Sequence, residues 1–549
     1  MRRPGILILL LVSGVPTVAG LVAALWFGLD AAAFLRVLNT PGVGLSIASS
    51  VWTGVSATLL SLMLAHVVLA VANTGNWRRR LTALSLPFLA MPHLATGIGV
   101  ALVLAPSGLL LRLLSPWATG FTEPPDWFSV HDPYGLSLIA GLMLKETAFL
   151  VLVLSAAQSQ APTGRLLLQA RSLGYGRLKS WLVAVAPLLQ QQIGLPLAAV
   201  LVFGITNVEM AIPLGPGLPP TFSVLLWSWF VDADPQVHAQ AWAGSLLLLL
   251  VTALTVLAAS RLASGVGSLW RRWAESGSRL RRERSLRGAA CTIMGGMWIL
   301  GILALVAILL RAAAGPWRFP QVLPSSTGAD SFAAWSAALP GGSNVAGTTV
   351  VLALATAVAG ALLVLPAAEA LRGDANGRRK LGTCLFLPLL LPQITFLFGV
   401  QVLLVSAGID GTFAAVLWSH LIFALPYVWG VIGPARAAID PRYAAVGRTL
   451  GAGPVRVWMT VTAPLTLRSM LLAMALAFSV SVALYLPTLF AGAGRVATAA
   501  TEAAASAGSG TLRLAAMHSV WLAVFPLLAF AAAYAASAAV FRHRRGVPR

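Results

Sequence analysis

The chain carries very little charge. Only 10% of its 549 residues are charged, whereas soluble proteins contain about 25%. Hydrophobic residues make up 58% of the chain, and the polar stretches between apolar runs are short. This composition excludes a soluble globular protein and leaves no room for a large domain outside a lipid bilayer. We therefore expect an all-α polytopic membrane protein.

Cysteine and lysine are also scarce. The two cysteines, Cys291 and Cys384, lie in apolar runs without metal-ligand spacing. The only lysines are Lys145, Lys179 and Lys380, and none follows a glycine. A Walker A phosphate loop needs Gly-Lys-Ser/Thr, so the chain lacks this means of binding ATP. No zinc-protease helix, paired-carboxylate cleft or nucleophile elbow is present. The sequence predicts no catalytic residue, metal or cofactor, and we do not expect an enzyme.

Long apolar runs, in contrast, are abundant. A membrane-spanning helix needs about 20 apolar residues, and twelve such runs can be drawn. The first run, from Gly5 to Leu29, is too long for the apolar region of a signal peptide, and we expect it to remain as an uncleaved span. The runs are 5–29, 48–72, 83–106, 136–158, 186–207, 240–260, 289–312, 344–368, 382–406, 413–435, 464–487 and 513–541.

The basic residues predict the orientation of these spans. The net charge is +21, and with the N-terminus inside, 30 of the 37 Lys and Arg residues fall in cytoplasmic segments. Both termini are then cytoplasmic, and the positive charge meets the anionic inner leaflet rather than a nucleic acid. The basic segments are Arg2–Arg3, Arg78–Arg80, Arg165–Lys179, Arg261–Arg287, Arg372–Lys380, Arg436–Arg468 and Arg542–Arg549.

One cytoplasmic segment occurs twice. The first repeat loop (Gln169–Leu188) reads QARSLGYGRLKSWLVAVAPL, and the second repeat loop (Val446–Leu465) reads VGRTLGAGPVRVWMTVTAPL. Residues 174 and 451 correspond, an offset of 277. Gly99 and Gly399 match at an offset of 300, so a whole half is duplicated. The matched loop residues are Arg171/Arg448, Gly174/Gly451, Gly176/Gly453, Trp181/Trp458 and Pro187/Pro464.

The duplication divides the chain into two like-oriented halves. We expect a first half over 1–262 with its loop at 159–185, a linker over 263–288, and a second half over 289–549 with its loop at 436–463. In each loop an amphipathic helix runs to a glycine, which can adopt the left-handed conformation that ends a helix. A proline thirteen residues later opens the next apolar run. Two short helices on a tight turn predict a rigid docking element.

The two loops resemble the "EAA" loop of permease subunits of binding-protein-dependent ABC importers, in which Glu-Ala-Ala precedes a glycine and a proline follows thirteen residues later. The resemblance covers both halves and points to a fused permease of the iron, thiamine and spermidine kind, similar to the Ynj-type permeases. It implies the type I importer fold with two six-helix halves, two copies of an ABC ATPase, a periplasmic substrate-binding protein and a bacterial inner membrane. The family's glutamate falls on Leu168 and Ala445, so both copies lack the acid.

A few polar residues lie inside the predicted spans, where a charge costs about 2.5–3.5 kcal/mol. Lys145 and Glu146 are adjacent in the fourth span, so their side chains point about 100° apart on a helix. They either line a substrate path or bridge helices. His420, in the tenth span, is either a path residue or a satisfied core histidine. Glu209 and Tyr485 lie at matching outer ends of spans and are further candidates for the path, although Glu209 could equally be interfacial and solvated.

Two questions remain open from the sequence. The linker, with Trp270, Trp273 and Leu280 among arginines, is either an amphipathic surface helix or a solvated tether. The alternative function is a twelve-span secondary transporter of the major facilitator type, since LRGDANGRRK, with Asp374 and Gly377, loosely resembles that family's loop motif. That alternative gives no reason for the matched repeat loops. The transported substrate cannot be read from the sequence.

Overall fold

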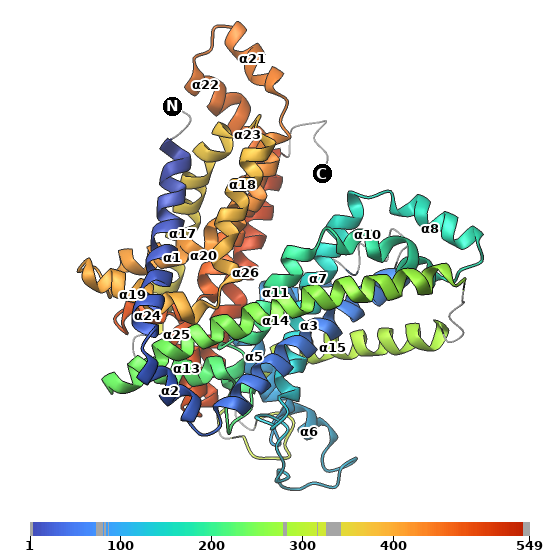
Figure 1. Cartoon of the computed structure of the whole chain (residues 1–549), viewed down its shortest axis with the longest axis vertical. Helices are drawn as coiled ribbons and strands as arrows, with labels where there is room; N and C mark the ends of the chain where they lie inside the picture. Colours follow the sequence, from blue (N-terminus) through green and yellow to red (C-terminus); the bar gives the residue numbers. More distant parts are fainter. Residues whose placement is uncertain are drawn as a thin grey trace. The chain divides into compact units, whose positions relative to one another are not determined.

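The computed structural model describes residues 4–541 apart from 73–80, 82–83, 86, 278–282, 316 and 325–341 (Figure 1). Within these residues, helices are the only regular secondary structure. Some residues used above to predict the orientation and the linker lie outside this part of the chain. They are Arg2, Arg3, Arg78–Arg80, Arg279, Leu280, Arg281, Arg282 and Arg542–Arg549.

Ten helical segments in the described residues are long and apolar enough to cross a membrane. A further pair, α18 (Ala375–Phe386) with the 3-10 turn η2 (Leu387–Leu390) and then α19 (Gln393–Ser406), is bent by 98° and would make eleven. The ten contain α1 (Pro4–Gly28), α3 (Val43–Val71), α5 (His93–Leu104) with α6 (Leu109–Leu114), α7 (Leu136–Ser159), α14 (Pro235–Glu275), α15 (Glu283–Ala313), α17 (Gly342–Ala370), α20 (Phe413–Ala437), α22 (Pro454–Val457) with α23 (Ala463–Ala483), and α26 (Leu512–Phe541).

The chain is therefore a multi-pass membrane protein, but the predicted count of twelve spans is not confirmed. The fifth predicted run, 186–207, holds only α10 (Ala186–Gln190) and the short apolar helix α11 (Gly194–Thr206). The remaining helices are short and connect the spans. They are α2 (Ala31–Asn39), α8 (Thr163–Ser172), α9 (Arg177–Ser180), α12 (Ala211–Leu214), α13 (Phe222–Phe230), α21 (Pro441–Thr449), α24 (Leu486–Gly492) and α25 (Ala499–Gly508).

The helices form two compact units. Unit 1 contains Met1–Ala24, Leu339–Glu502 and Trp521–Arg549, and unit 2 contains Leu25–Ala338 and Ala503–Val520. Most of α1 thus belongs to the unit that is built mainly from the second half of the sequence. In the same way α15, the first helix after the linker, belongs to unit 2. Each unit therefore includes the leading helix of the other sequence half.

Each leading helix crosses another helix of its unit at a glycine that is matched between the two sequence halves. In unit 1, α1 crosses α19 so closely that a Cβ on Gly399 would overlap the backbone of Gly20. In unit 2, a Cβ on Gly99 of α5 would lie 2.9 Å from the Cβ of Ala304 in α15. The absence of a side chain lets two helix backbones meet. The sequence match between Gly99 and Gly399 therefore corresponds to the same kind of helix crossing in both units.

The third and ninth apolar runs, which we predicted as single spans, are each interrupted at a proline. In unit 2 the residues Met91 and Pro92 are not helical, and α5 begins at His93. In unit 1 the break falls at Leu391 and Pro392, before α19. Proline lacks the N–H that continues a helix and disfavours a helical conformation at the preceding residue. Carbonyl groups before each break are left without intrahelical partners.

Helix α14 extends into the predicted linker. It begins at an Asp234 N-cap followed by Pro235, a strong start signal, and continues for 41 residues. At 1.5 Å per residue this is about 60 Å, about twice the thickness of the hydrocarbon core. The sixth span thus runs on through Trp270 and Trp273, and α15 begins at Glu283. The residues expected to form a separate surface helix or tether are largely the ends of these two spans.

The side chain of Arg112 in α6 is hydrogen-bonded to the chain segment that follows α15. Its guanidinium group donates hydrogen bonds to the backbone oxygens of Arg318 and Gln321, both at 2.8 Å, and of Trp317 at 3.3 Å. Its Nε donates to Ser107 O at 2.8 Å. The Arg112 side chain also lies over the Trp317 ring, 4.4 Å from the centroid, and the residue is only 5% exposed. A planar donor group with five N–H bonds suits this set of carbonyls.

We expect the Arg112→Leu variant to lose about 2–4 kcal/mol of stability, because several carbonyls lose a charged donor. Arg112→Lys should recover only part of this loss, since an ammonium group cannot reproduce the fork. Thermal unfolding in detergent measures the effect. Arg36→Leu is the matched control, since Arg36 is exposed and reaches only Asp30 at 4.0 Å. Equal shifts in the Arg112 and Arg36 variants would contradict the assignment.

Candidate functional site

The two repeat loops have the same local structure. Helix α8 ends where Gly174 N–H bonds to Arg171 O and Tyr175 N–H bonds to Ala170 O. Helix α21 ends with the corresponding bonds from Gly451 to Arg448 and from Ala452 to Gly447. This is the Schellman pattern, and its glycine must be left-handed. Both Gly174 and Gly451 have φ of 81°, which confirms the conformation predicted from the sequence.

The segments after the glycines also match. Gly176 and Gly453 precede α9 and α22, and each of these helices continues into a π-helical turn, η1 (Trp181–Val185) or η3 (Trp458–Thr462). Pro187 and Pro464 lie at the second position of the helix that follows. A proline in a helix clashes with the carbonyl four residues earlier, and a widened turn relieves this clash. The repeated proline thus accounts for a repeated π turn.

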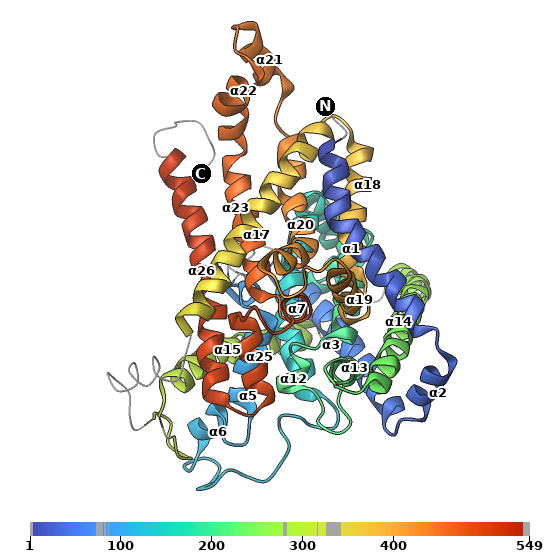
Figure 2. The same cartoon turned by 90° about the vertical axis from the view of Figure 1, so that its left-hand side faces the viewer.

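The loops differ in their surroundings. In unit 2, Trp181 is fully buried and donates from Nε1 to His66 Nδ1 of α3 at 3.2 Å. In unit 1, the matching Trp458 is 41% exposed, and α21 has no buried residue. Figures 1 and 2 both show α21 and α22 projecting beyond the end of α23. Arg171 and Arg448 are exposed in both loops, as are Leu168 and Ala445 at the positions of the family's glutamate.

Lys145 lies in α7 at the proline break of unit 2. The residue is 3% exposed, and its Nζ donates to Phe88 O at 2.9 Å, to Leu89 O at 3.1 Å and to Met91 O. These are carbonyl groups at the end of the helical segment that precedes Pro92. A cation there compensates both the missing hydrogen bonds and the negative end of the helix dipole. The charge is thus used to close a helix end inside the apolar region.

Glu146 contacts a residue on the other side of the same break. Its carboxylate lies 3.7 Å from Nε2 of His93, the first residue of α5, and His93 packs on the ring of Phe203 at 4.4 Å between centroids. Adjacent residues on α7 thus reach the two sides of the Pro92 break, as their angular separation predicts. The buried Glu209 also acts electrostatically on Lys145. His93 was not among the residues predicted from the sequence, although its position directly after Pro92 was a usable signal.

His420 and Tyr485 lie in unit 1, with different surroundings. His420 is 0% exposed, and its two ring nitrogens are hydrogen-bonded to Ser481 Oγ at 2.7 Å and to Thr488 Oγ1 at 2.8 Å. Ser481 in turn donates to Thr356 Oγ1 at 3.3 Å. Tyr485 is buried at the start of α24. In the same unit, Phe423 of α20 stacks on Phe396 of α19, which lies one turn after Pro392.

The chemistry available in these places is that of binding and conformational change. Among the described residues, no group of three or more His, Cys, Asp or Glu side chains could hold a metal ion. The buried charges of unit 2 are occupied with one another and with backbone groups. The repeat loops, in contrast, carry exposed polar and apolar side chains, among them Arg171, Leu168 and Arg448.

Comparison with known proteins identifies a similar membrane protein. The chain is 31% identical over 496 residues to the inner membrane ABC transporter permease protein YnjC of Escherichia coli (strain K12). The matched region covers 88% of this chain and 86% of that protein. No protein-family model matches the chain.

Proposed function

Because this chain belongs to the ABC transporter permeases of the bacterial inner membrane, we propose that it is the transmembrane subunit of an importer that is driven by separate ATPase subunits. Its membership of this family rules out the major facilitator alternative. In the proposed mechanism, the chain forms the substrate path, and two EAA-like repeat loops transmit ATP-driven movement to it. The chain supplies the path and the docking elements, and its partners hydrolyse ATP.

The matching local structure of the two repeat loops carries this proposal. Two segments 277 residues apart share a Schellman turn at φ of 81° and a π turn before a proline. Neither feature is needed to connect two membrane helices, since any short polar loop would do so. A rigid element that occurs once per half suits a partner that is present in two copies. The docking residues we propose are the five matched pairs that begin with Arg171/Arg448 and end with Pro187/Pro464.

The topology and partners follow from the same proposal. We place both termini and both repeat loops in the cytoplasm, with halves over 1–262 and 289–549, twelve membrane passages in the type I importer arrangement, and two copies of an ABC ATPase. A periplasmic binding protein delivers the substrate on the other side. Lys145, Glu146, Glu209, His420 and Tyr485 remain the candidates for the substrate path. The contacts of Lys145 and His420 give both residues a structural task as well.

Co-purification tests the proposal directly. Affinity purification of the chain from its native membrane, in mild detergent, should bring down a soluble ATPase at two copies per chain, measured by native mass spectrometry. The complex should hydrolyse ATP, whereas the separated chain should not, because it lacks a phosphate loop. Transport by the isolated chain in vesicles, driven by an ion gradient without an ATPase, would contradict the proposal.

A further inference from the structure

Equivalent residues of the two repeat loops differ sharply in exposure. Leu178 is 2% exposed, whereas its counterpart at an offset of 277, Val455, is 71% exposed. Lys179 is buried, and its counterpart Arg456 is exposed. Because the two loops share their backbone conformation, this difference must come from what packs against each loop.

A carboxylate from the start of α15 holds the first repeat loop. Glu283 Oε1 accepts a hydrogen bond from the backbone N–H of Leu178 at 2.9 Å, in the first turn of α9. The N–H groups of a first turn have no partners within the helix, and a carboxylate there is favourable. The same carboxylate lies against Gly176, where an added Cβ would overlap it. Gly176 is therefore needed for close approach, since its φ of –68° is open to other residues.

The end of α14 supplies two further contacts. Trp270 Nε1 donates to Leu182 O at 3.0 Å, in the π turn, whose widened spacing frees backbone carbonyls. The Trp273 ring lies 4.2 Å from Lys179 Nζ, and the Tyr175 ring lies 5.1 Å from it. Burial lowers the pKa of Lys179, and the two ring faces oppose this by favouring the cation.

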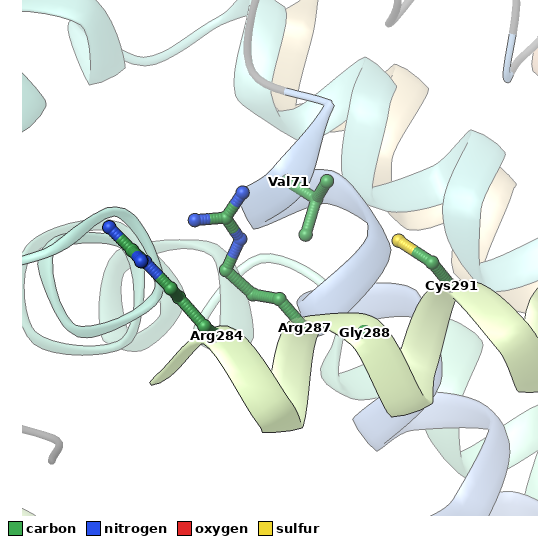
Figure 3. A pocket seen from close by; sticks show the side chains of 5 residues that line it. All are labelled: Val71, Arg284, Arg287, Gly288 and Cys291. Carbon is green, nitrogen blue, oxygen red and sulfur yellow. The ribbon is translucent and has the colours of Figure 1, made fainter. Parts of the chain in front are cut away.

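The start of α15 is itself anchored to unit 2. Arg287 Nη1 lies 3.9 Å from Glu283 Oε1, one helical turn away. Arg284 and Arg287 line a shallow groove with Gly288, Cys291 and Val71 of α3 (Figure 3). In Figure 3 the Arg287 side chain reaches towards the end of α3 that carries Val71. Glu283 thus reaches the first repeat loop from α15, while Leu178 and Trp181 of that loop pack on α3.

Nothing comparable covers the second repeat loop within the described part of unit 1. Besides Val455, its apolar side chains include Leu450 at 81% and Met459 at 63% exposed, next to Trp458. Apolar groups that project in this way on a rigid element mark a site for a protein partner. The exposed Arg448 and Arg456 lie among them.

We infer that the two repeat loops dock to the ATPases in non-equivalent ways, because a linker latch holds only the first. The linker latch consists of Glu283, Trp270 and Trp273. The position of the first repeat loop is therefore fixed by its contacts with α14 and α15. The second loop is unlatched, and the ATPase subunit that docks there covers its apolar face. The identification of the ATPase as the protein that covers the second loop rests on the proposed function. The latch itself can be tested on the permease alone.

Cysteine labelling of the purified chain, in a Cys291→Ser/Cys384→Ser background, tests the latch. A maleimide should modify Val455→Cys at least about tenfold faster than Leu178→Cys, because a protected site reacts only on local opening. Adding Glu283→Ala and Trp273→Ala should raise the rate at Leu178→Cys and leave Val455→Cys unchanged. Glu283→Gln, which keeps an acceptor oxygen, should preserve protection. Equal rates at the two cysteines, or no response to the latch variants, would overturn the latch.

The assembled complex tests the unequal docking. Bound ATPase should protect Val455→Cys from the maleimide. Glu283→Ala should lower kcat for substrate-stimulated ATP hydrolysis without changing KM for ATP, and Glu283→Gln should restore kcat, as expected of a positioning residue. Labelling of Val455→Cys that ATPase binding does not slow would overturn this docking mode and leave the proposed function standing. Purification without any ATPase would refute the proposed function and leave the labelling result on the latch intact.

Discussion

Replacement of Lys145 by methionine should destabilise the protein by about 3–5 kcal/mol, as expected when one partner of a buried charged arrangement is removed. The variant leaves the carbonyl groups of Phe88, Leu89 and Met91 without their donor. It also leaves the buried Glu146 and Glu209 without the cation that acts on them. The measurement is the unfolding midpoint of the purified chain in detergent, together with its yield in the membrane fraction.

Two comparisons make the Lys145 result specific. Lys380→Met removes the charge of an exposed lysine and should shift the midpoint little. The double variant Lys145→Met/Glu146→Gln should cost less than the sum of its two single variants, because the second change removes a charge that the first left uncompensated. If Lys145→Met behaves like Lys380→Met, Lys145 does not hold the Pro92 break.

Valine at Gly174 or at Gly451 should leave the chain folded in the membrane and reduce substrate-stimulated ATP hydrolysis by the complex about tenfold or more. Both glycines have φ of 81°, where a β-branched residue carries about 1–3 kcal/mol of strain. Since Gly174 and Gly451 both lie at exposed turns, the turn will yield before the spans do. The measurement is the ATPase rate with and without substrate, in a complex of defined stoichiometry.

The controls for this experiment use other residues at comparable places. Gly164→Val, in α8, meets no atom within 4 Å and has no left-handed backbone, so its ATPase rate should stay near that of the parent. Gly174→Asn and Gly451→Asn should retain most activity, since asparagine tolerates the left-handed region. Full activity in both valine variants would remove the docking role from the repeat loops.

Local features of the repeat loops could be predicted from the sequence because they depend on single residue types. A glycine that ends an amphipathic helix requires a left-handed turn whatever surrounds it, and Gly174 and Gly451 both adopt one. Apolar runs predicted most of the candidate spans in the described residues, but the run 186–207 holds only short helices. The prolines at 92 and 392 also break their helices locally, but we read those runs as single spans because the run length outweighed the proline.

The candidate site was less predictable. Lys145 and Glu146 could be identified as costly charges, but their partners lie more than 50 residues away at Phe88 and His93. Periodicity cannot show which helix faces which, since every side of a membrane helix is apolar. His420 illustrates the same limit, because only the positions of Ser481 and Thr488 show that both its ring nitrogens are occupied.

The amino-acid sequence alone determined the membrane environment, the duplicated loops and their turns, because each depends on composition or on the conformational range of one residue. Only the tertiary structure decided that leading helices join the units of the opposite sequence halves and that α14 continues into the linker and contacts one loop. Both depend on packing between distant segments, where the free energy comes from surfaces that meet only after folding. Leu178 and Val455 therefore occupy equivalent places in the sequence and unequal places in the protein.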